Sequence, residues 1–332
     1  MRVLLTGSSG YIGRYLAPLL RQAGHMVVGL DRTPDPGVPL DNFLSADLLE
    51  PDRYRAALER IDHICHLAAA RGDWGISKEE YYRDNLEATR TLLETARGAG
   101  VKRWIFYSTV SALGPSVTPL PEEAPWRAIN PYGGSKADCE ALFDRYVAEV
   151  PGAHVLTIRP SAVFGPGNPE NTNIFRLIDA IYRNHFVMVG RGQEVKTTSH
   201  LDNLLEAHMF LMDRQARQGG NGHEIYHYVD EPAETTESLV TKIYALLGMR
   251  RPRFRLPRPI AASAAVVGDA TAAVTGIDMP ITSARVRKFC TATNFSGKKI
   301  SKLGFKQPVS NDEALRRTVD WYLEHYLPRK DA

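Results

Sequence analysis

Tyr132 and Lys136 are the two residues whose types and spacing most directly suggest chemistry. If a helix opens at Tyr132, Lys136 follows one turn later on the same face. A free tyrosine has a pKa near 10, which is too high for a general base at neutral pH. A neighbouring ammonium group favours the phenolate, and a shift of about three pKa units needs about 4 kcal/mol of differential stabilisation. The pair therefore predicts a base that can take the proton of a hydroxyl group.

A Tyr-x-x-x-Lys match is by itself common on exposed helix faces, so other motifs must support it. Ser108 and Thr109 do so, because they follow a predicted strand at 104–107, where a hydroxyl can share the substrate proton. Glycines at 7, 10 and 13 give further support, because they follow an apolar strand at 3–5 and open a predicted helix at 11–22. There backbone N–H groups and a helix N-terminus can meet a pyrophosphate. The spacing is G-x-x-G-x-x-G rather than G-x-G-x-x-G. The sequence predicts a dinucleotide-binding turn.

Asp31 ends the second predicted strand at the distance where a carboxylate holds the ribose hydroxyls of an adenosine. A carboxylate there repels a 2′-phosphate, which favours NAD over NADP. Arg32 follows, and its guanidinium could in principle form an ion pair with that phosphate. Asp47 and Leu48 follow the next β-type stretch and suggest an adenine clamp, although a simple turn aspartate explains the pattern almost equally well.

Strands and helices must alternate for these residues to meet. Short apolar runs predict buried strands, and segments of helical periodicity lie between them. The predicted strands are 3–5, 26–30, 63–67, 104–107 and 155–158, and the predicted helices are 11–22, 81–97 and 135–150. This alternation predicts an α/β fold, a doubly wound parallel sheet of the Rossmann type.

The pattern changes after Arg159, where proline and glycine crowd 160–169 and helices dominate. The predicted helices there are 174–184, 203–214, 237–247 and 312–326. We expect an NAD-binding domain at 1–165 and a smaller, mostly helical substrate-binding lobe at 166–330. Segments near 190–230 are expected to return to the first domain.

Composition narrows the class of protein. The chain has 332 residues, 43% of them hydrophobic, and a net charge of +3 that is scattered rather than clustered. We expect no nucleic-acid partner. Three distant cysteines, Cys65, Cys139 and Cys290, suggest reduced thiols in a cytoplasmic protein, and no metal-ligand spacing is present. The apolar stretch 260–275 is shorter than the ~20 residues that span a bilayer. We expect a helix packed on the small lobe there, and no membrane partner.

These motifs together resemble an extended short-chain dehydrogenase/reductase of the NAD-dependent epimerase/dehydratase group, and the resemblance covers nearly the whole chain. The matching motifs are Thr6 to Gly13, His66 to Ala69, Asn85, Ser108-Thr109 with Gly114, Asn130-Pro131-Tyr132 with Lys136, Arg159-Pro160, Val163 to Gly167, His200 to Asn203 and Leu303-Gly304-Phe305. The resemblance implies Thr109, Tyr132 and Lys136 as the catalytic set. It also implies a homodimer formed through the helices near 85–97 and 135–150.

The cofactor implied is NAD. Its expected contacts are Gly7, Ser9, Gly10, Tyr11, Ile12, Gly13, Asp31, Arg32, Asp47, Leu48, Leu67, Ala68, Ala69, Asn85, Ser108, Tyr132, Lys136, Pro160 and Val163.

Departures from the family indicate the reaction. Related sugar dehydratases carry an Asp-Glu pair after the active hydroxyl residue, because eliminating water needs an extra acid and base. Val110 and Ser111 occupy those positions here and cannot do that work. We expect a nucleotide-sugar epimerase, acting at C4, in which hydride passes to NAD, a 4-keto sugar turns over in the site and hydride returns to its other face.

A nucleotide diphosphate would anchor such a substrate. Its expected contacts are Thr109, Ser111, Asn173, Lys196 and Arg285, where exposed surface residues are an even alternative for the last three. A loop at 71–75 carries Trp74, which could cover a sugar ring. The competing function is a 3β-hydroxysteroid dehydrogenase-like oxidation of a secondary alcohol. It is favoured by Leu113, by the run His200 to Asn203 and by the apolar stretch 260–275.

Overall fold

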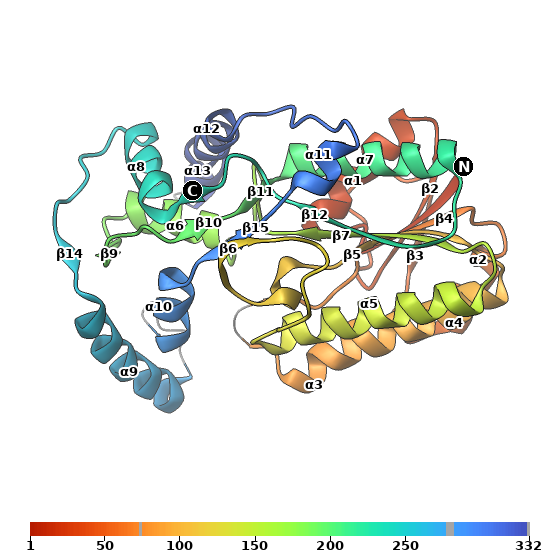
Figure 1. The fold of residues 1–332 in the computed structure, drawn as a ribbon, viewed down its shortest axis with the longest axis horizontal. Coiled ribbons are helices and arrows are strands. Elements are labelled where there is room, and N and C mark those ends of the chain that lie inside the picture. The colour runs from red at the N-terminus through yellow and green to blue at the C-terminus, as the bar shows by residue number, and fades with distance from the viewer. Residues whose placement is uncertain (73–74, 277–281, 331–332) are drawn as a thin grey trace.

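The centre of the computed structural model, which describes residues 1–72, 75–276 and 282–330, is a seven-stranded parallel sheet (Figure 1). Its strand order is β12-β7-β5-β4-β1-β2-β3. The strands are β1 Arg2–Thr6, β2 Met26–Asp31, β3 Asn42–Ser45, β4 His63–His66, β5 Arg103–Tyr107, β7 His154–Pro160 and β12 Gly222–Tyr228. Thr6 pairs with both Leu30 and His66, so the carboxyl ends of three central strands meet at one edge. The predicted doubly wound sheet is confirmed.

Helices cover both faces of the sheet (Figure 1). One face carries α1 (Tyr11–Gln22), α7 (Leu201–Gln218) and α11 (Lys298–Lys302), and the other carries α4 (Ala88–Gly98) and α5 (Pro131–Glu149). Each face has its own apolar core, because parallel strands are buried on both sides. On the α5 face, Trp104 and Phe143 meet edge to face with ring centroids 5.4 Å apart. These cores fix the sheet edge where the chemistry lies.

The predicted helix at 81–97 is interrupted by a π-helical turn. It consists of α3 (Lys78–Tyr81), the π-turn η2 (Tyr82–Glu87) and α4. Such single turns widen a helix locally and are frequent at functional sites. Here the π-turn contains the buried Asn85. Short elements that the periodicity did not predict are η1 Pro51–Arg53, α2 Arg55–Leu58 and η3 Val110–Leu113.

The smaller lobe has its own helical core. It is built from α6 (Asn173–Tyr182), α8 (Thr236–Leu246), α12 (Asn311–Trp321) and η4 (Tyr322–Tyr326), with α13 (Leu327–Lys330) closing the described chain. The helices predicted near 174–184, 203–214, 237–247 and 312–326 are therefore confirmed.

The lobe also contains a mixed sheet that the sequence did not predict, of order β13-β10-β15-β6. Its strands are β6 Ser116–Leu120, β10 Val195–Lys196, β13 Glu234–Thr235 and β15 Thr293–Phe295. Two further strand pairs are β8 Ala162–Phe164 with β11 Thr198–His200, and β9 Met188–Val189 with β14 Arg255–Leu256. Strands of two to five residues leave no readable periodicity.

The predicted helix at 260–275 is present as α9 (Arg258–Thr275), beside α10 (Ser283–Cys290). It is packed on α10 by a narrow face and is otherwise largely exposed, so the expected burial on the small lobe is only partly met. In the described ranges, no helix has the length and apolar character needed to cross a bilayer. Among those same residues, no cluster of metal-ligating side chains occurs. Trp74 lies outside the described residues.

Candidate active site

The loop after β1 is packed so closely against its surroundings that only glycine fits at positions 7 and 13. Gly7 has a φ of +70°, and a Cβ there would lie 2.7 Å from the backbone nitrogen of Ala68. A Cβ at Gly13 would overlap the carbonyl oxygen of Gly7. The N-cap of α1 is Gly10, which has no side chain to cap the helix, so its first N–H groups are left for a ligand or solvent. The loop is a cradle for an anion, as the fingerprint predicts.

Asp31 lies at the end of β2, beside this cradle. Its carboxylate accepts hydrogen bonds from the backbone N–H of Ser9 at 3.0 Å and of Thr33 at 3.3 Å. The Thr33 hydroxyl donates to the Ser9 hydroxyl at 2.8 Å. An acceptor held this way can take hydroxyl donors of a ribose and repels a phosphate.

Arg32 is held by two carboxylates. Its guanidinium lies 3.1 Å from Asp84 and 3.7 Å from Asp47. Asp47 also accepts a hydrogen bond from the N–H of Leu49 at 2.9 Å. With its charge paired in this way, Arg32 is poorly placed to favour a 2′-phosphate, so the neighbourhood of Asp31 fits NAD better than NADP.

A buried hydrogen-bond chain fixes the end of β4 against β1. The Thr6 hydroxyl and His66 Nδ1 are 2.7 Å apart, and His66 Nε2 lies 3.0 Å from the Thr89 hydroxyl. The Ala68 N–H donates to the Thr6 hydroxyl at 3.2 Å. Burial lowers the pKa of His66 to about 3, so the ring is neutral. Sequence reasoning missed the role of Thr6, although its place at a strand end next to the glycines was visible.

The side chain of Asn85 is fully hydrogen-bonded to protein groups on two segments of the site, at Ala70 and at Ser135. Its side-chain oxygen accepts from the N–H of Ala70 at 2.7 Å. Its amide donates to the Ala70 carbonyl at 3.2 Å and to the Ser135 hydroxyl at 2.9 Å. The Ser135 hydroxyl in turn donates to the carbonyl of Tyr132 at 2.9 Å. Asn85 therefore ties the Leu67-Ala68-Ala69 loop to the first turn of α5.

Tyr132 lies in the first turn of α5, as expected. Asn130 caps this helix by accepting the Gly133 N–H at 2.7 Å, and Pro131 starts it. A Cβ at Gly133 would lie 2.5 Å from the Ser111 carbonyl oxygen, so α5 approaches the Thr109–Ser111 turn closely. The Thr109 hydroxyl accepts from the Ser111 N–H at 3.1 Å and lies near enough to the Tyr132 phenol to lower its pKa.

Lys136 is buried one turn beyond Tyr132. Its side chain is only 1% exposed, and the ammonium lies 4.2 Å from the centroid of the Phe106 ring. Burial lowers its pKa to about 8. The Tyr132 phenol has its pKa raised by burial, partly offset by the charge of Arg71 and by the Thr109 hydroxyl. Arg71 is a cation near the phenol that sequence reasoning did not single out.

Comparison with known proteins identifies the family to which this arrangement belongs. A model of the NAD dependent epimerase/dehydratase family matches residues 3–226.

The chain belongs to the NAD-dependent epimerase/dehydratase family.

Curated relatives include N-acetyl-α-D-glucosaminyl-diphospho-ditrans,octacis-undecaprenol 4-epimerase of Escherichia coli O157:H7. It is 30% identical over 324 residues, which is 97% of this chain and 96% of that protein. Sterol-4-α-carboxylate 3-dehydrogenase, decarboxylating, of Mus musculus is 28% identical, with 98% and 91% covered. Among solved structures, MoeE5 in complex with UDP-glucuronic acid and NAD is 25% identical with a TM-score of 0.77, and both chains are covered in full.

NAD is the cofactor, and the site fits it. The side-chain-free cradle at Gly7, Gly10 and Gly13 admits a pyrophosphate, and Asp31 offers an acceptor beside it. The Ser108 hydroxyl, at the carboxyl end of the same sheet, is buried without a hydrogen-bond partner in the described structure, as expected for a group that awaits a ligand. The remaining expected contacts lie around the sheet edge. They are Tyr11 and Ile12 in α1, Leu48 after β3, Pro160 at the end of β7 and Val163 in β8.

The expected diphosphate contacts, Lys196, Arg285 and Asn173, do not form one cluster with Thr109 and Tyr132. Lys196 lies in β10, where its ammonium donates to the carbonyl of Lys288 at 2.7 Å and to that of Thr291. It therefore holds the carboxyl end of α10. Burial lowers its pKa to about 8. Arg285 is half-buried within α10, and Asn173 is the exposed first residue of α6. The structure thus brings Thr109, Ser111 and Tyr132 together, and Lys196 with α10, as two separate groups.

Buried polar atoms next to Gly165 were not among the predicted contacts. Within the described residues, both ring nitrogens of His200 and both amide atoms of Asn168 lack a hydrogen-bond partner, and His200 Nδ1 lies 3.9 Å from the Asp202 carboxylate. A Cβ at Gly165 would lie 3.4 Å from His200 Nε2 and 3.1 Å from the Tyr11 hydroxyl. The Pro-Gly-rich run at 160–169 was the available signal, but it does not say which polar atoms face inward.

Proposed function

We propose that this protein is an NAD-dependent epimerase that inverts C4 of a sugar carried on a nucleotide diphosphate. The observation that carries the proposal is the close approach of the Thr109–Ser111 turn to the first turn of α5, where Thr109 lies near the Tyr132 phenol. The residues after Thr109 are Val110 and Ser111, which provide no second acid–base pair for eliminating water. That combination suits a reaction that oxidises an alcohol and reverses the oxidation.

The residues divide the work by position. Tyr132 takes the proton of the C4 hydroxyl and returns a proton to the C4 oxygen after the 4-keto sugar has turned over. The Thr109 hydroxyl, which lowers the pKa of the phenol, can share that proton. Held at the glycine cradle and Asp31, NAD would accept the hydride from C4 of the sugar and would supply it again for the reverse transfer.

Opposing effects act on the pKa of the Tyr132 phenol, and burial is the largest of them. Burial alone raises the pKa of the Tyr132 phenol, which opposes its use as a base. The charge of Arg71 and the Thr109 hydroxyl act in the other direction. Lys136, one turn away with a pKa of about 8, is mostly protonated at neutral pH. We propose Thr109, Tyr132 and Lys136 as the catalytic set.

Substrate contacts follow from the same proposal. Ser111 beside Thr109 would contact the reacting sugar, and Lys196, Asn173 and Arg285 would contact the diphosphate. We also propose a homodimer through α4 and α5, whose outer faces lie on the same side of the sheet (Figure 1).

A second candidate substrate is a sugar diphosphate carried on a polyprenol. The Escherichia coli relative, which matches nearly the whole chain, is named for such a substrate. Both substrates share the sugar and the diphosphate, so the same catalytic set serves either. The carrier is the part that differs.

The competing function is net oxidation of a secondary alcohol, in the manner that the name of the mouse relative implies for that protein. One experiment separates the two. Purified enzyme with NAD and UDP-glucose, UDP-N-acetylglucosamine or UDP-glucuronic acid should interconvert the C4 epimers, seen by chromatography, without net NADH. Steady accumulation of NADH with a steroid alcohol and no epimer with any sugar, including an undecaprenyl-linked one, would overturn the proposal.

A further inference from the structure

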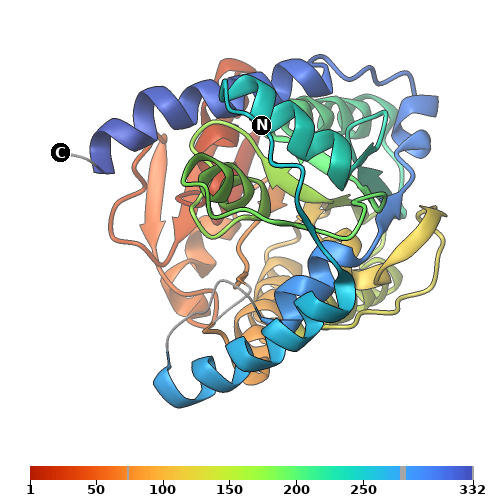
Figure 2. The same cartoon turned by 90° about the vertical axis from the view of Figure 1, so that its left-hand side faces the viewer.

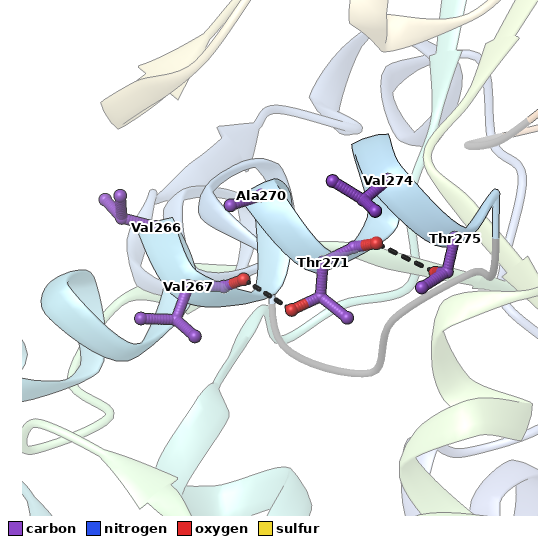
Figure 3. A pocket seen from close by; sticks show the side chains of 6 residues that line it. All are labelled: Val266, Val267, Ala270, Thr271, Val274 and Thr275. Carbon is purple, nitrogen blue, oxygen red and sulfur yellow. Dashed lines mark hydrogen bonds between the residues drawn. The ribbon is translucent and has the colours of Figure 1, made fainter.

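Helix α9 presents a long apolar face to solvent. Figure 3 shows Val266, Val267 and Val274 projecting from the helix around a surface hollow of about 480 Å³. Val267 is 66% exposed and Val274 is 87% exposed. Ile260 lies further toward the helix start and is also exposed. In both views of the whole molecule α9 lies at the periphery, beside α10 (Figures 1 and 2).

Helix α9 exposes its larger apolar residues and buries its small ones, whereas an ordinary surface helix exposes charged residues and buries the larger apolar ones. Its buried positions are the small residues Ala261, Ala265, Gly268 and Ala272, three or four apart, so they form one narrow stripe. The exposed positions carry alanine, valine, isoleucine, serine and threonine. Within this helix only Arg258 and Asp269 are charged, and Asp269 accepts the N–H of Ser283 at 3.1 Å. A surface helix normally turns its charged face outward, so something other than water is expected to cover this one.

The segment that leads into α9 is strongly basic. Residues 250–258 contain five arginines and no acidic residue. Arg251 and Arg255 pair with Glu237, and Arg258 pairs with Glu194. Arg250 and Arg253 are exposed, and no ion-pair partner for them occurs in the described parts of the chain. Phe254, between two of these arginines, is also exposed.

We propose that α9 and the segment 250–258 dock on an anionic phospholipid surface, with α9 lying in the plane of the membrane. An apolar helix face enters the headgroup boundary, and nearby arginines bind acidic headgroups. A second copy of the chain fits less well. Among the described residues of 250–290, Asp269 is the only acidic side chain, and it is engaged with Ser283. The described residues of this surface in a second copy therefore offer no free carboxylate to the exposed arginines.

The docking face connects to the proposed substrate side. α9 packs on α10, and the carboxyl end of α10 receives the ammonium of Lys196 through the Lys288 carbonyl. A protein seated on a bilayer by α9 would hold this side of the lobe near the membrane. That placement suits the lipid-linked substrate proposed above. It departs from the sequence expectation of no membrane partner, and it does not require the epimerase proposal to hold.

The test is co-sedimentation of the full-length protein with vesicles, without substrate. Wild type should bind vesicles of phosphatidylcholine mixed with phosphatidylglycerol, bind pure phosphatidylcholine more weakly and lose binding at high salt. The variant Val266→Ser/Val267→Ser/Val274→Ser should bind about tenfold more weakly or worse, because three apolar side chains no longer leave water. The variant Arg250→Gln/Arg253→Gln should lose about fivefold per arginine on the anionic vesicles.

Matched exchanges elsewhere serve as controls. Val117→Ser removes a valine of β6 that is 80% exposed, and Lys302→Gln/Lys306→Gln removes two exposed charges far from α9. Both should bind vesicles like wild type, and all variants should keep the wild-type circular dichroism melt. Turnover of a water-soluble sugar nucleotide without vesicles should also be unchanged in the α9 variant.

Two results would overturn the proposal. The first is wild-type protein that stays in solution with anionic vesicles. The second is a triple-valine variant that binds them like wild type. If wild type fails to bind and sedimentation velocity shows that the valine exchanges turn a dimer into a monomer, the face is covered by a second copy. Loss of epimerase activity in every assay would leave the vesicle result standing, so the two proposals fail separately.

Discussion

The cofactor side and the substrate side of this molecule are assembled in different ways. Around the cofactor cradle, β1, the glycine loop, α1 and β2 follow one another within residues 2–31. The small sheet on the substrate side takes β6, β10, β13 and β15 from four parts of the chain that lie between residues 116 and 295. The first is held by local backbone packing. The second depends on the whole chain being folded.

The contrast extends to what fills each side. Backbone atoms and short side chains line the cradle, and a single Cβ at Gly7 would collide with it. The substrate side contains long side chains such as Lys196, and it continues into a helix whose outer face is uncovered. A fixed cofactor needs one rigid shape, whereas substrates of one family differ. Substitutions on the cofactor side should therefore test steric fit, and substitutions on the substrate side should test substrate affinity.

The largest effect is expected where the two sides meet, at Tyr132. Tyr132→Phe keeps the ring beside Tyr81, 6.0 Å between centroids, but removes the proton acceptor. We expect kcat to fall about 10²–10⁴-fold, the range for loss of a general acid–base. NAD affinity, followed by fluorescence titration, should stay within a few-fold. Tyr182→Phe, on the exposed face of α6, is the control. Parallel loss of turnover and NAD binding would assign Tyr132 a structural role instead.

The cradle should be intolerant of one methyl group. Gly7 and Gly24 both have positive φ, +70° and +82°, but a Cβ at Gly24 meets nothing within 4 Å. Gly24→Ala should cost about 1–2 kcal/mol of backbone strain. Gly7→Ala adds overpacking of about 1–3 kcal/mol against the Ala68 backbone and should weaken NAD binding at least about tenfold. Urea unfolding and NAD titration measure both. Equal effects of the two exchanges on stability and NAD affinity would mean that the loop around Gly7 shifts to accommodate the methyl group.

Acid sensitivity should lie in the large sheet and in α7, which packs on it. Burial lowers the pKa values of His63, His66, His208 and His227 to about 3. An unfolded histidine has a pKa near 6.5, so between pH 6.5 and 3 the unfolded state binds more protons than the folded state. The free energy of unfolding therefore decreases as the pH is lowered through this range. Each histidine contributes about 1.4 kcal/mol per pH unit well below 6.5.

The check is the urea-derived free energy of unfolding at pH 7, 6 and 5. His208→Phe keeps a ring against Tyr107, where the centroids are now 5.7 Å apart. Between pH 6 and 5 its slope should be shallower by about 1 kcal/mol per unit, approaching about 1.4 at lower pH, and the difference should be smaller between pH 7 and 6. An unchanged slope would show that His208 is protonated in the folded state, contrary to its burial.

The smallest effect is expected on the substrate side, at Lys196. Lys196→Met leaves the carbonyls of Lys288 and Thr291 without a donor and should cost about 1–3 kcal/mol of stability. If the ammonium also meets the diphosphate, KM for a nucleotide sugar should rise about tenfold with kcat little changed. Lys242→Met, which removes ion pairs to Glu234 and Asp312, is the control. A lower melting temperature with unchanged KM would confine Lys196 to holding α10.

Much of the site could be predicted from residues close together in sequence. Gly7 to Gly13, Asp31 and the Tyr132–Lys136 pair form local patterns, because strand ends and helix turns fix their relative positions. The role of Asn85 could not, since its hydrogen bonds reach Ala70 and Ser135, far along the chain. Pairing of Arg32 by Asp84 is another contact across sequence, and it bears on the choice of cofactor.

The sequence by itself determined the parallel sheet, the NAD cradle and the tyrosine–lysine pair, because periodicity and glycine sterics act over a few residues. Tertiary structure alone decided where Lys196 points, which small residues α9 buries and that its valines face outward. A run of alanines and valines is equally compatible with a buried helix and an exposed one. Only the neighbours that pack against it, here α10 on one narrow stripe, separate the two.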